Sequence, residues 1–303
     1  MNRNGGSKLA WIFLLAVGIW FVLFLRKKLM FKFGFAPNSL DLKQIKGLKK
    51  LGDALVRSLN ESYMENVEER VKKEIKLKEN EYKWRLLDLK RYFILTAFLK
   101  ETPMFSVKVD ELWHQMLMFT REYDDFSKKY LGTTLHHSPN VNLSPDPDLR
   151  GFFDWVYAEL FFIRAENIYL YNGFFRSPVQ PAIIEEFRNL SENELIEKYF
   201  KGDTQYTVPL LALVTSMKKT ANSISDYEKN VIQDKLKKSK RQKNYNAMLM
   251  PALSVAYFHY DEFANYMKID SERSTSSSSC GSASSCSSCT SDSSCSSCGG
   301  GGD

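Results

Sequence analysis

An uninterrupted apolar run from Leu9 to Leu25 constrains this chain more than any other feature. Its 17 residues, LAWIFLLAVGIWFVLFL, include neither a charge nor a proline. As a helix rising about 1.5 Å per residue, the run would span roughly 26 Å, slightly less than a hydrocarbon core of about 30 Å. Snorkelling of the flanking Lys8 and Arg26 and local bilayer thinning would cover the difference. We therefore predict a single transmembrane helix over residues 9–25, preceded by a short tail over residues 1–8.

Two other interpretations of the run are weaker. A cleaved signal peptide needs small residues at its cleavage site, whereas the run is followed by RKKLMFK, which is basic and aromatic. A buried core helix is disfavoured by the basic residues on both flanks.

The charges on the two flanks predict the orientation of the helix. Arg3 and Lys8 precede it, and a larger basic group follows: Arg26, Lys27, Lys28 and Lys32. The more positive side stays in the cytoplasm, so we expect the N-terminus outside and a cytoplasmic soluble domain. The same basic group, in a juxtamembrane segment over residues 26–35, is a candidate contact for anionic lipid.

Composition indicates one folded domain after the anchor. An apolar content of 44%, with 14% aromatic residues, is enough to form a core and excludes disorder throughout. The net charge of +6 suits a protein beside an anionic membrane and is too small to indicate nucleic acid by itself. All five cysteines lie in the last 24 residues, so no disulfide stabilises the folded part.

Hydrophobic periodicity predicts an all-α domain over residues 36–270, because strand-like alternation is nearly absent. Tyr82, Leu86, Leu89, Phe93 and Ala97 form a core-facing stripe at helical spacing. Helices are expected over residues 40–100 (weakened at Gly47 and Gly52 and broken near residues 78–80), 107–131, 151–165, 191–200, 208–220, 226–243 and 247–267. Residues 271–303, rich in Ser, Cys and Gly, are expected to be disordered.

The most informative motif begins within the helix expected at 107–131. An Asp-x-x-Trp-His group, formed by Asp110, Trp113 and His114, is followed by a tyrosine, a glycine and a His-His-x-Pro sequence. The later members of the motif are Tyr123, Gly132, His136, His137 and Pro139.

In this motif the chain resembles the glycine-rich domain-containing protein-like family. The resemblance is clearest over Val109 to Pro139 and extends over about Leu86 to Phe200. Two features depart from the family: Ser127 stands where a cysteine is common, and the tail is richer in Ser and Cys than in Gly. The resemblance implies a domain without a settled enzymatic activity.

Asp110, His114, His136 and His137 are candidate ligands for zinc or iron, because imidazole and carboxylate suit both metals. One continuous helix to Gly132 would place the His pair about five turns from His114, so the loop would have to fold back along the helix. The competing structural interpretation is that Asp110 accepts a hydrogen bond from His114 and the His pair bonds to backbone. It is the interpretation favoured by the sequence, which therefore predicts no bound cofactor.

The tail holds two Cys-x-x-Cys pairs, Cys286 with Cys289 and Cys295 with Cys298. Only five residues separate the pairs, against about a dozen in a folded zinc ribbon, so a defined metal site is not expected there. The basic run from Lys235 to Lys243 is interpreted as a solvated helix end or a lipid contact, and a role in binding nucleic acid is disfavoured.

From sequence we expect a membrane-anchored helical domain that binds an unknown protein partner or acts as a scaffold, rather than an enzyme. The alternative is a metal-dependent enzyme that uses His114 with His136 or His137. Metal analysis separates the two hypotheses.

Overall fold

A computed structural model describes residues 18–19, 32–137, 147–226 and 229–268 of the chain. The predicted transmembrane helix lies outside the described residues except for Gly18 and Ile19, as do residues 1–8 and the Ser/Cys/Gly-rich tail. No helix formed by the described residues is both long and apolar enough to cross a bilayer.

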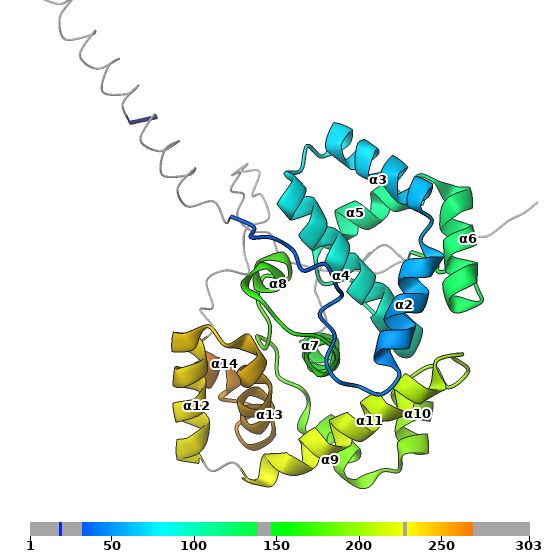
Figure 1. Ribbon diagram of the computed structural model, residues 1–303. Coiled ribbons are helices and arrows are strands. Elements are labelled where there is room, and N and C mark those ends of the chain that lie inside the picture. The colour runs from blue at the N-terminus through cyan, green and yellow to red at the C-terminus, as the bar shows by residue number, and fades with distance from the viewer. Residues whose placement is uncertain (1–17, 20–31, 138–146, 227–228, 269–303) are drawn as a thin grey trace, which may run out of the picture. The chain divides into compact units, whose positions relative to one another are not determined.

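The all-α prediction is confirmed: apart from isolated bridges, every regular element among the described residues is a helix (Figure 1). The α-helices are α2 (Leu48–Ser58), α3 (Glu61–Glu74), α4 (Glu79–Phe98), α5 (Val107–Leu117), α6 (Thr120–Leu131), α7 (Pro147–Leu160), α8 (Ala165–Leu170), α9 (Pro181–Asn189), α10 (Glu192–Tyr199), α11 (Thr207–Asn222), α12 (Lys229–Gln242), α13 (Leu249–Phe258) and α14 (Phe263–Met267). Short 3-10 helices cover Ser223–Asp226 and Tyr245–Met248.

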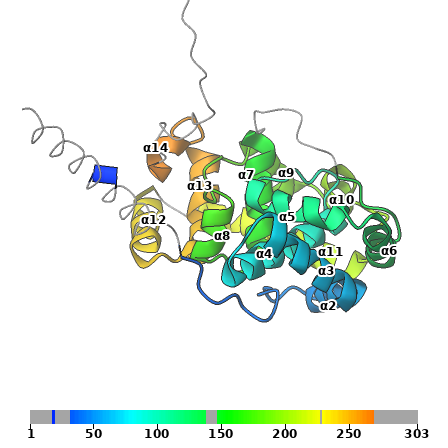
Figure 2. The ribbon, with the colours of Figure 1, turned by 90° about the horizontal axis from the view of Figure 1, so that it is seen from above.

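Helix α4 is the central element of the domain. Figures 1 and 2 both place α5 and α8 beside it, and it also packs against α2. The expected stripe is buried except for Leu86, which is half-buried. The helix also buries residues on its other sides, including Asp88, Arg91 and Leu95. Helix α4 is therefore buried on more sides than the predicted stripe indicates.

The single helix expected over residues 107–131 is wrong. The structure divides it at Met118 and Phe119 into α5 and α6, which pack against each other. At the end of α5 the Met116 carbonyl oxygen accepts hydrogen bonds from the Phe119 N–H at 3.2 Å and from the Tyr63 hydroxyl at 2.9 Å. Phe119 packs edge-on against the Tyr63 ring, with centroids 6.0 Å apart. Contacts from α3 therefore accompany the break.

The other expected elements agree in part. The break near residue 78 is confirmed, since α3 ends at Glu74 and α4 begins at Glu79. A capping box opens α10: Ser191 Oγ accepts from the Glu194 N–H at 3.3 Å, and a Glu194 carboxylate oxygen accepts from the Ser191 N–H at 2.8 Å. The helix expected over residues 247–267 is divided by a turn at residues 259–262, and α9 was not expected.

Residues 32–47, which we call the connector, are not helical, although a helix was expected from Leu40. The connector runs beside α8 and α4 to the start of α2 (Figures 1 and 2). Leu42 forms an isolated antiparallel bridge with Phe161, and the Lys43 N–H donates to the Leu160 carbonyl at 2.8 Å. Trp84 Nε1 also donates to the Gly34 carbonyl at 3.0 Å, so contacts with the helices begin within the segment predicted as juxtamembrane.

Candidate metal centre

Asp110, His114 and His137 meet at one place on the surface of the domain. One ligand atom from each of the three lies within 4.8 Å of the other two. His137 Nε2 is 2.8 Å from Asp110 Oδ1, and His114 Nδ1 is 3.8 Å from Asp110 Oδ2. The two imidazole centroids are 4.6 Å apart. Two nitrogen donors and one carboxylate therefore face a common point.

The local fold explains this convergence. Asp110 and His114 are four residues apart on α5, which places them on one face of the helix. Helix α6 ends at Gly132, whose φ of 79° is the left-handed conformation that glycine adopts readily. Because the chain turns between α5 and α6, the segment after Gly132 returns to α5 and brings His137 to Asp110. The objection based on one continuous helix therefore does not hold.

Trp113 and Tyr123 support the returning segment from within the core. Trp113 Nε1 donates to the Tyr123 hydroxyl at 3.0 Å, and that hydroxyl donates to the Leu135 carbonyl at 2.8 Å. The Trp113 and His137 rings meet edge to face, with centroids 4.3 Å apart. The Ser127 hydroxyl donates to the Tyr123 carbonyl at 2.8 Å. These contacts define the position of the His137 ring.

Two tyrosines near the cluster are held in their neutral form. Burial raises the pKa of Tyr123 to about 12. Burial also raises the pKa of Tyr92, with a further contribution from the negative charge of Asp110. The Tyr92 ring packs against Trp113 at a centroid distance of 5.2 Å. Both hydroxyls therefore remain hydrogen-bond donors at neutral pH.

Exposure differs across the three candidate ligands. The His137 side chain is 8% exposed and Asp110 is 27% exposed, whereas His114 is 51% exposed. Zinc–ligand distances of about 2.1 Å place tetrahedral ligand atoms roughly 3.4 Å apart. The widest separation here exceeds that value, so one ligand must move by about 1 Å. The exposed His114 side chain has room for this rotation.

The remaining candidate residues do not join the cluster. His136 is exposed, and the ligand group found among the described residues contains His137 instead. The pKa of Asp124 is lowered, chiefly by its hydrogen bonds from Lys128 and Thr134 and to a smaller extent by the proximity of His136. Pro139 and the tail cysteines Cys286, Cys289, Cys295 and Cys298 lie outside the described residues, as do Arg26, Lys27 and Lys28.

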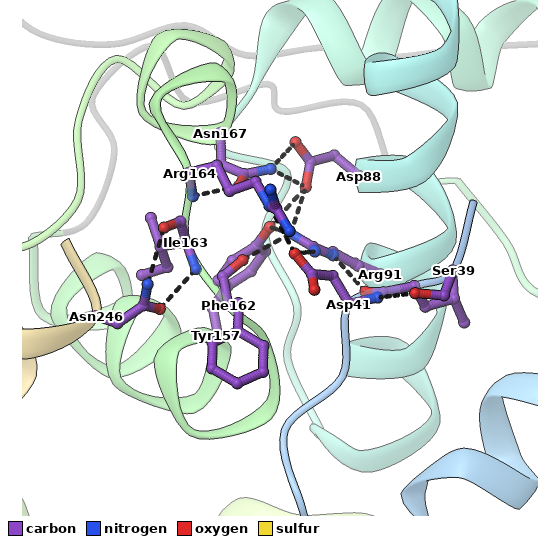
Figure 3. A network of polar contacts seen from close by, with 11 residues as sticks. Ser39, Asp41, Asp88, Arg91, Tyr157, Phe162, Ile163, Arg164, Asn167 and Asn246 are labelled. Carbon is purple, nitrogen blue, oxygen red and sulfur yellow. Dashed lines mark hydrogen bonds and ion pairs between the residues drawn. The ribbon is translucent and has the colours of Figure 1, made fainter. Parts of the chain in front are cut away.

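A second polar cluster, which the sequence analysis missed, is buried beneath the connector (Figure 3). Asp88 accepts hydrogen bonds from the Tyr157 hydroxyl at 2.6 Å and from Asn167 Nδ2 at 2.9 Å. Arg91 Nη1 donates to the same Tyr157 hydroxyl at 2.8 Å, and Arg91 Nε donates to the Leu40 carbonyl at 3.0 Å. This cluster joins the connector to α4, α7 and α8.

The buried cluster is structural in character. Burial raises the pKa of Asp88, although the charge of Arg91 opposes that rise. Both side chains are fully buried, and neither carboxylate nor guanidinium has access to a ligand from solvent. The sequence signal was weak, because Asp88 and Arg91 stand in a part of α4 that also contains the charged residues Arg85 and Lys90. Their partners are too distant in sequence for that signal to identify them.

Comparisons with known proteins give one match. A family model described as UCP032817-like matches residues 54–152, about a third of the chain. That interval contains the whole Asp110–Pro139 motif, and the description states no activity. No curated protein and no solved structure matches the chain.

Proposed function

We propose that this chain is a membrane-anchored, metal-binding helical domain whose functional centre is formed by Asp110, His114 and His137. The observation that carries the proposal is the convergence of these three side chains from two separate segments. It favours the metal-dependent alternative raised by the sequence over a metal-free scaffold. Residues 9–25 would supply the anchor, with the domain on the cytoplasmic side.

The motif behind the family resemblance supports this assignment. Asp110, His114 and His137 provide the candidate ligands, while Trp113 and Tyr123 hold the segment that carries His137. Gly132 provides the left-handed end of α6 that starts this segment. The proposal thus gives one explanation for most of the motif, and the resemblance to the glycine-rich domain-like family remains part of the proposal.

A purely structural role explains less of the arrangement. The 2.8 Å contact between His137 and Asp110 is sufficient to fix the segment after α6. It does not require His114, whose 3.8 Å separation from Asp110 exceeds an ordinary hydrogen bond. His114 is instead placed where a third ligand would complete a site that is open to solvent on one side. Three protein ligands with an open position are typical of catalytic metal sites.

The donor set indicates the class of metal. Two imidazoles and one carboxylate suit zinc, and they also match the ligand set of many non-haem iron(II) sites. We therefore propose a divalent transition metal, with an open coordination position for a substrate or a partner group. Calcium and magnesium prefer sets made of oxygen ligands.

Metal binding by the full chain tests the proposal. All five tail cysteines are first changed to serine, because their thiols also bind zinc. In detergent, titration with cobalt(II) followed by absorption, and then zinc competition, should give one site per chain. We expect His114→Ala and His137→Ala each to weaken binding about tenfold or more, because each removes a direct ligand.

His136→Ala is the matched control, since it removes an adjacent, exposed imidazole outside the cluster. It should leave the affinity unchanged. If no site titrates in the serine-substituted chain, or if His136→Ala weakens binding as much as His137→Ala, the metal proposal is wrong. In the first case, a metal-free interaction role becomes the better hypothesis.

A further inference from the structure

We propose that one surface of the domain lies directly on the anionic face of the membrane. This interfacial patch is formed by Phe33, Phe35, Val107, Lys108 and Tyr169. The inference rests on the proposed anchor, and it adds that the domain has a fixed orientation on the bilayer. Its occupant is the leaflet into which residues 9–25 would insert.

The first residues of the connector are attached to the helices. The Gly34 N–H donates to a Glu166 carboxylate oxygen at 3.2 Å, and the Gly34 carbonyl accepts from Trp84 Nε1 at 3.0 Å. Asn80 Nδ2 donates to the Phe33 carbonyl at 3.3 Å. The Phe33 ring meets Tyr169 edge to face at 5.4 Å. The domain is therefore held close to the point where the chain leaves toward the predicted anchor.

Further contacts restrict rotation of the connector. Arg91 Nε donates to the Leu40 carbonyl at 3.0 Å. Arg164 Nε donates to an Asp41 carboxylate oxygen at 2.7 Å (Figure 3). The Phe162 N–H donates to the Asp41 carbonyl at 3.1 Å. Attachment at both Gly34 and Asp41 prevents the connector from acting as a flexible linker. The direction in which the chain leaves the domain at Lys32 is thus fixed relative to the helices.

Chain length limits the distance between the domain and the bilayer. Seven residues lead from Leu25 to Lys32. Even fully extended, they reach only about 25 Å. An anchor over residues 9–25 would therefore keep Phe33 within about 30 Å of the end of the apolar run.

The composition of the patch suits a membrane interface. Phe35 is 91% exposed and Val107 is 83% exposed, although both are large apolar residues. Lys108 Nζ lies 4.5 Å from the centroid of the Tyr169 ring. Aromatic side chains concentrate at headgroup level, where an apolar ring and a polar environment meet. The patch combines such rings with a cation.

Charge around the patch favours an anionic surface. Exposed lysines near the patch include Lys32, which precedes Phe33, and Lys78, which lies two residues before the Asn80 that contacts Phe33. Of the nearby carboxylates, Glu79 pairs with Lys83 at 2.6 Å, whereas Glu166 accepts from the Gly34 N–H and keeps its charge. Each basic residue near an anionic leaflet adds to the attraction. This attraction distinguishes a lipid surface from an uncharged protein groove.

Lipid-borne quenching tests the proposal on the full chain. Starting from the form with serine at all five tail cysteine positions, Phe35→Cys and Val107→Cys each receive a solvent-sensitive fluorophore. The chain is placed at one copy per nanodisc in bilayers of phosphatidylcholine and phosphatidylserine that contain headgroup-spin-labelled lipid. We expect strong quenching at both positions.

Val208→Cys is the matched control for Val107→Cys. Val208 is also an exposed valine near the start of a helix, and it lies beside Gly47 at the other end of the connector. Quenching at residue 107 should exceed that at residue 208 several-fold, with unchanged circular dichroism for both.

Equal quenching in a chain that enters the nanodisc overturns the patch and leaves the anchor intact. A chain that does not enter the bilayer overturns both. Quenching at residues 35 and 107 that is absent at one copy per disc, but appears when discs hold two, identifies a second copy as the occupant and also overturns the proposal.

Discussion

The Tyr123 hydroxyl occupies the middle of the hydrogen-bonded chain from Trp113 to Leu135. Tyr123→Phe would remove the acceptor of the buried Trp113 N–H and leave that donor without its partner. We expect unfolding free energy to fall by about 1–3 kcal/mol, because an unsatisfied buried donor loses its hydration without compensation. Denaturant unfolding of the full chain in detergent, followed by circular dichroism, measures the change.

Tyr171→Phe is the control for this prediction. The Tyr171 hydroxyl is buried and has no hydrogen-bond partner among the residues that the structure describes. Removing it should change stability by less than about 0.5 kcal/mol or increase it, since no bond is lost. If Tyr123→Phe costs no more than Tyr171→Phe, the Trp113–Tyr123–Leu135 chain does not stabilise the site.

At the scale of single residues, the sequence predicted only part of the site. Asp110 and His114 were predicted on one helical face, because a spacing of four residues determines that in any α-helix. The sequence could not show which of His136 and His137 lies beside Asp110, because adjacent residues in a loop have no fixed periodicity. Asp88 and Arg91 were missed because their partners come from the connector, α7 and α8.

Helix α7 contains Gly151 although glycine has a low helix propensity, and close packing against backbone explains why. A Cβ on Gly151 would lie 2.2 Å from the Pro178 carbonyl oxygen, which belongs to the backbone. Gly151→Ala should gain about 1 kcal/mol in helix propensity. We expect the overlap to outweigh this gain and to lower unfolding free energy by about 2 kcal/mol. Denaturant unfolding of the full chain measures the net effect.

Gly52→Ala in α2 is the matched control, because it is also a buried glycine inside a helix. There the nearest atoms are the Cδ1 atoms of Leu40 and Leu42, at 2.9 and 3.1 Å, and these side-chain ends can rotate. The change should cost less than about 1 kcal/mol. A Gly151→Ala variant that is as stable as Gly52→Ala would contradict the close-approach explanation.

At the scale of elements, the sequence predicted helices better than their ends. Periodicity identified most of the longer helices, because burial of one face imposes a pattern that extends over many residues. No proline or glycine marks the break between α5 and α6 in the sequence. Tyr63, which bonds to the end of α5 at this break, lies far away in sequence on α3. Residues 40–47 of the connector were mistaken for helix, because their backbone groups bond to Arg91 and Leu160 rather than within the segment. Such tertiary contacts do not appear in a local pattern.

At the scale of the whole molecule, the proposed metal centre and the interfacial patch share helix α5. Val107 is the first residue of that helix, and His114 follows seven residues later. The rise along the helix between them is about 10 Å. If both proposals hold, the open side of the metal centre lies close to the headgroup region. Substrates or partners would then be those available at the membrane surface.

The orientation of the predicted anchor would decide which side of the membrane the proposed metal centre faces. The larger basic group, from Arg26 to Lys32, follows the predicted anchor and should keep the C-terminal side in the cytoplasm. The five cysteines of the tail allow a direct measurement, because residues 1–279 include none. In intact cells, or in spheroplasts of a bacterium with an outer membrane, a membrane-impermeant maleimide should not label the chain. Labelling should appear after permeabilisation.

A single cysteine on the other side of the predicted anchor provides the control for this last prediction. With serine at all five tail positions, Ser7→Cys places one thiol before the predicted anchor. That thiol should react with the impermeant maleimide in intact cells, because an outside N-terminus leaves it accessible. Labelling of the tail cysteines before permeabilisation, together with protection of residue 7, would reverse the orientation. The Asp110–His114–His137 cluster would then face an extracytoplasmic space, where the tail thiols would be exposed to oxidation.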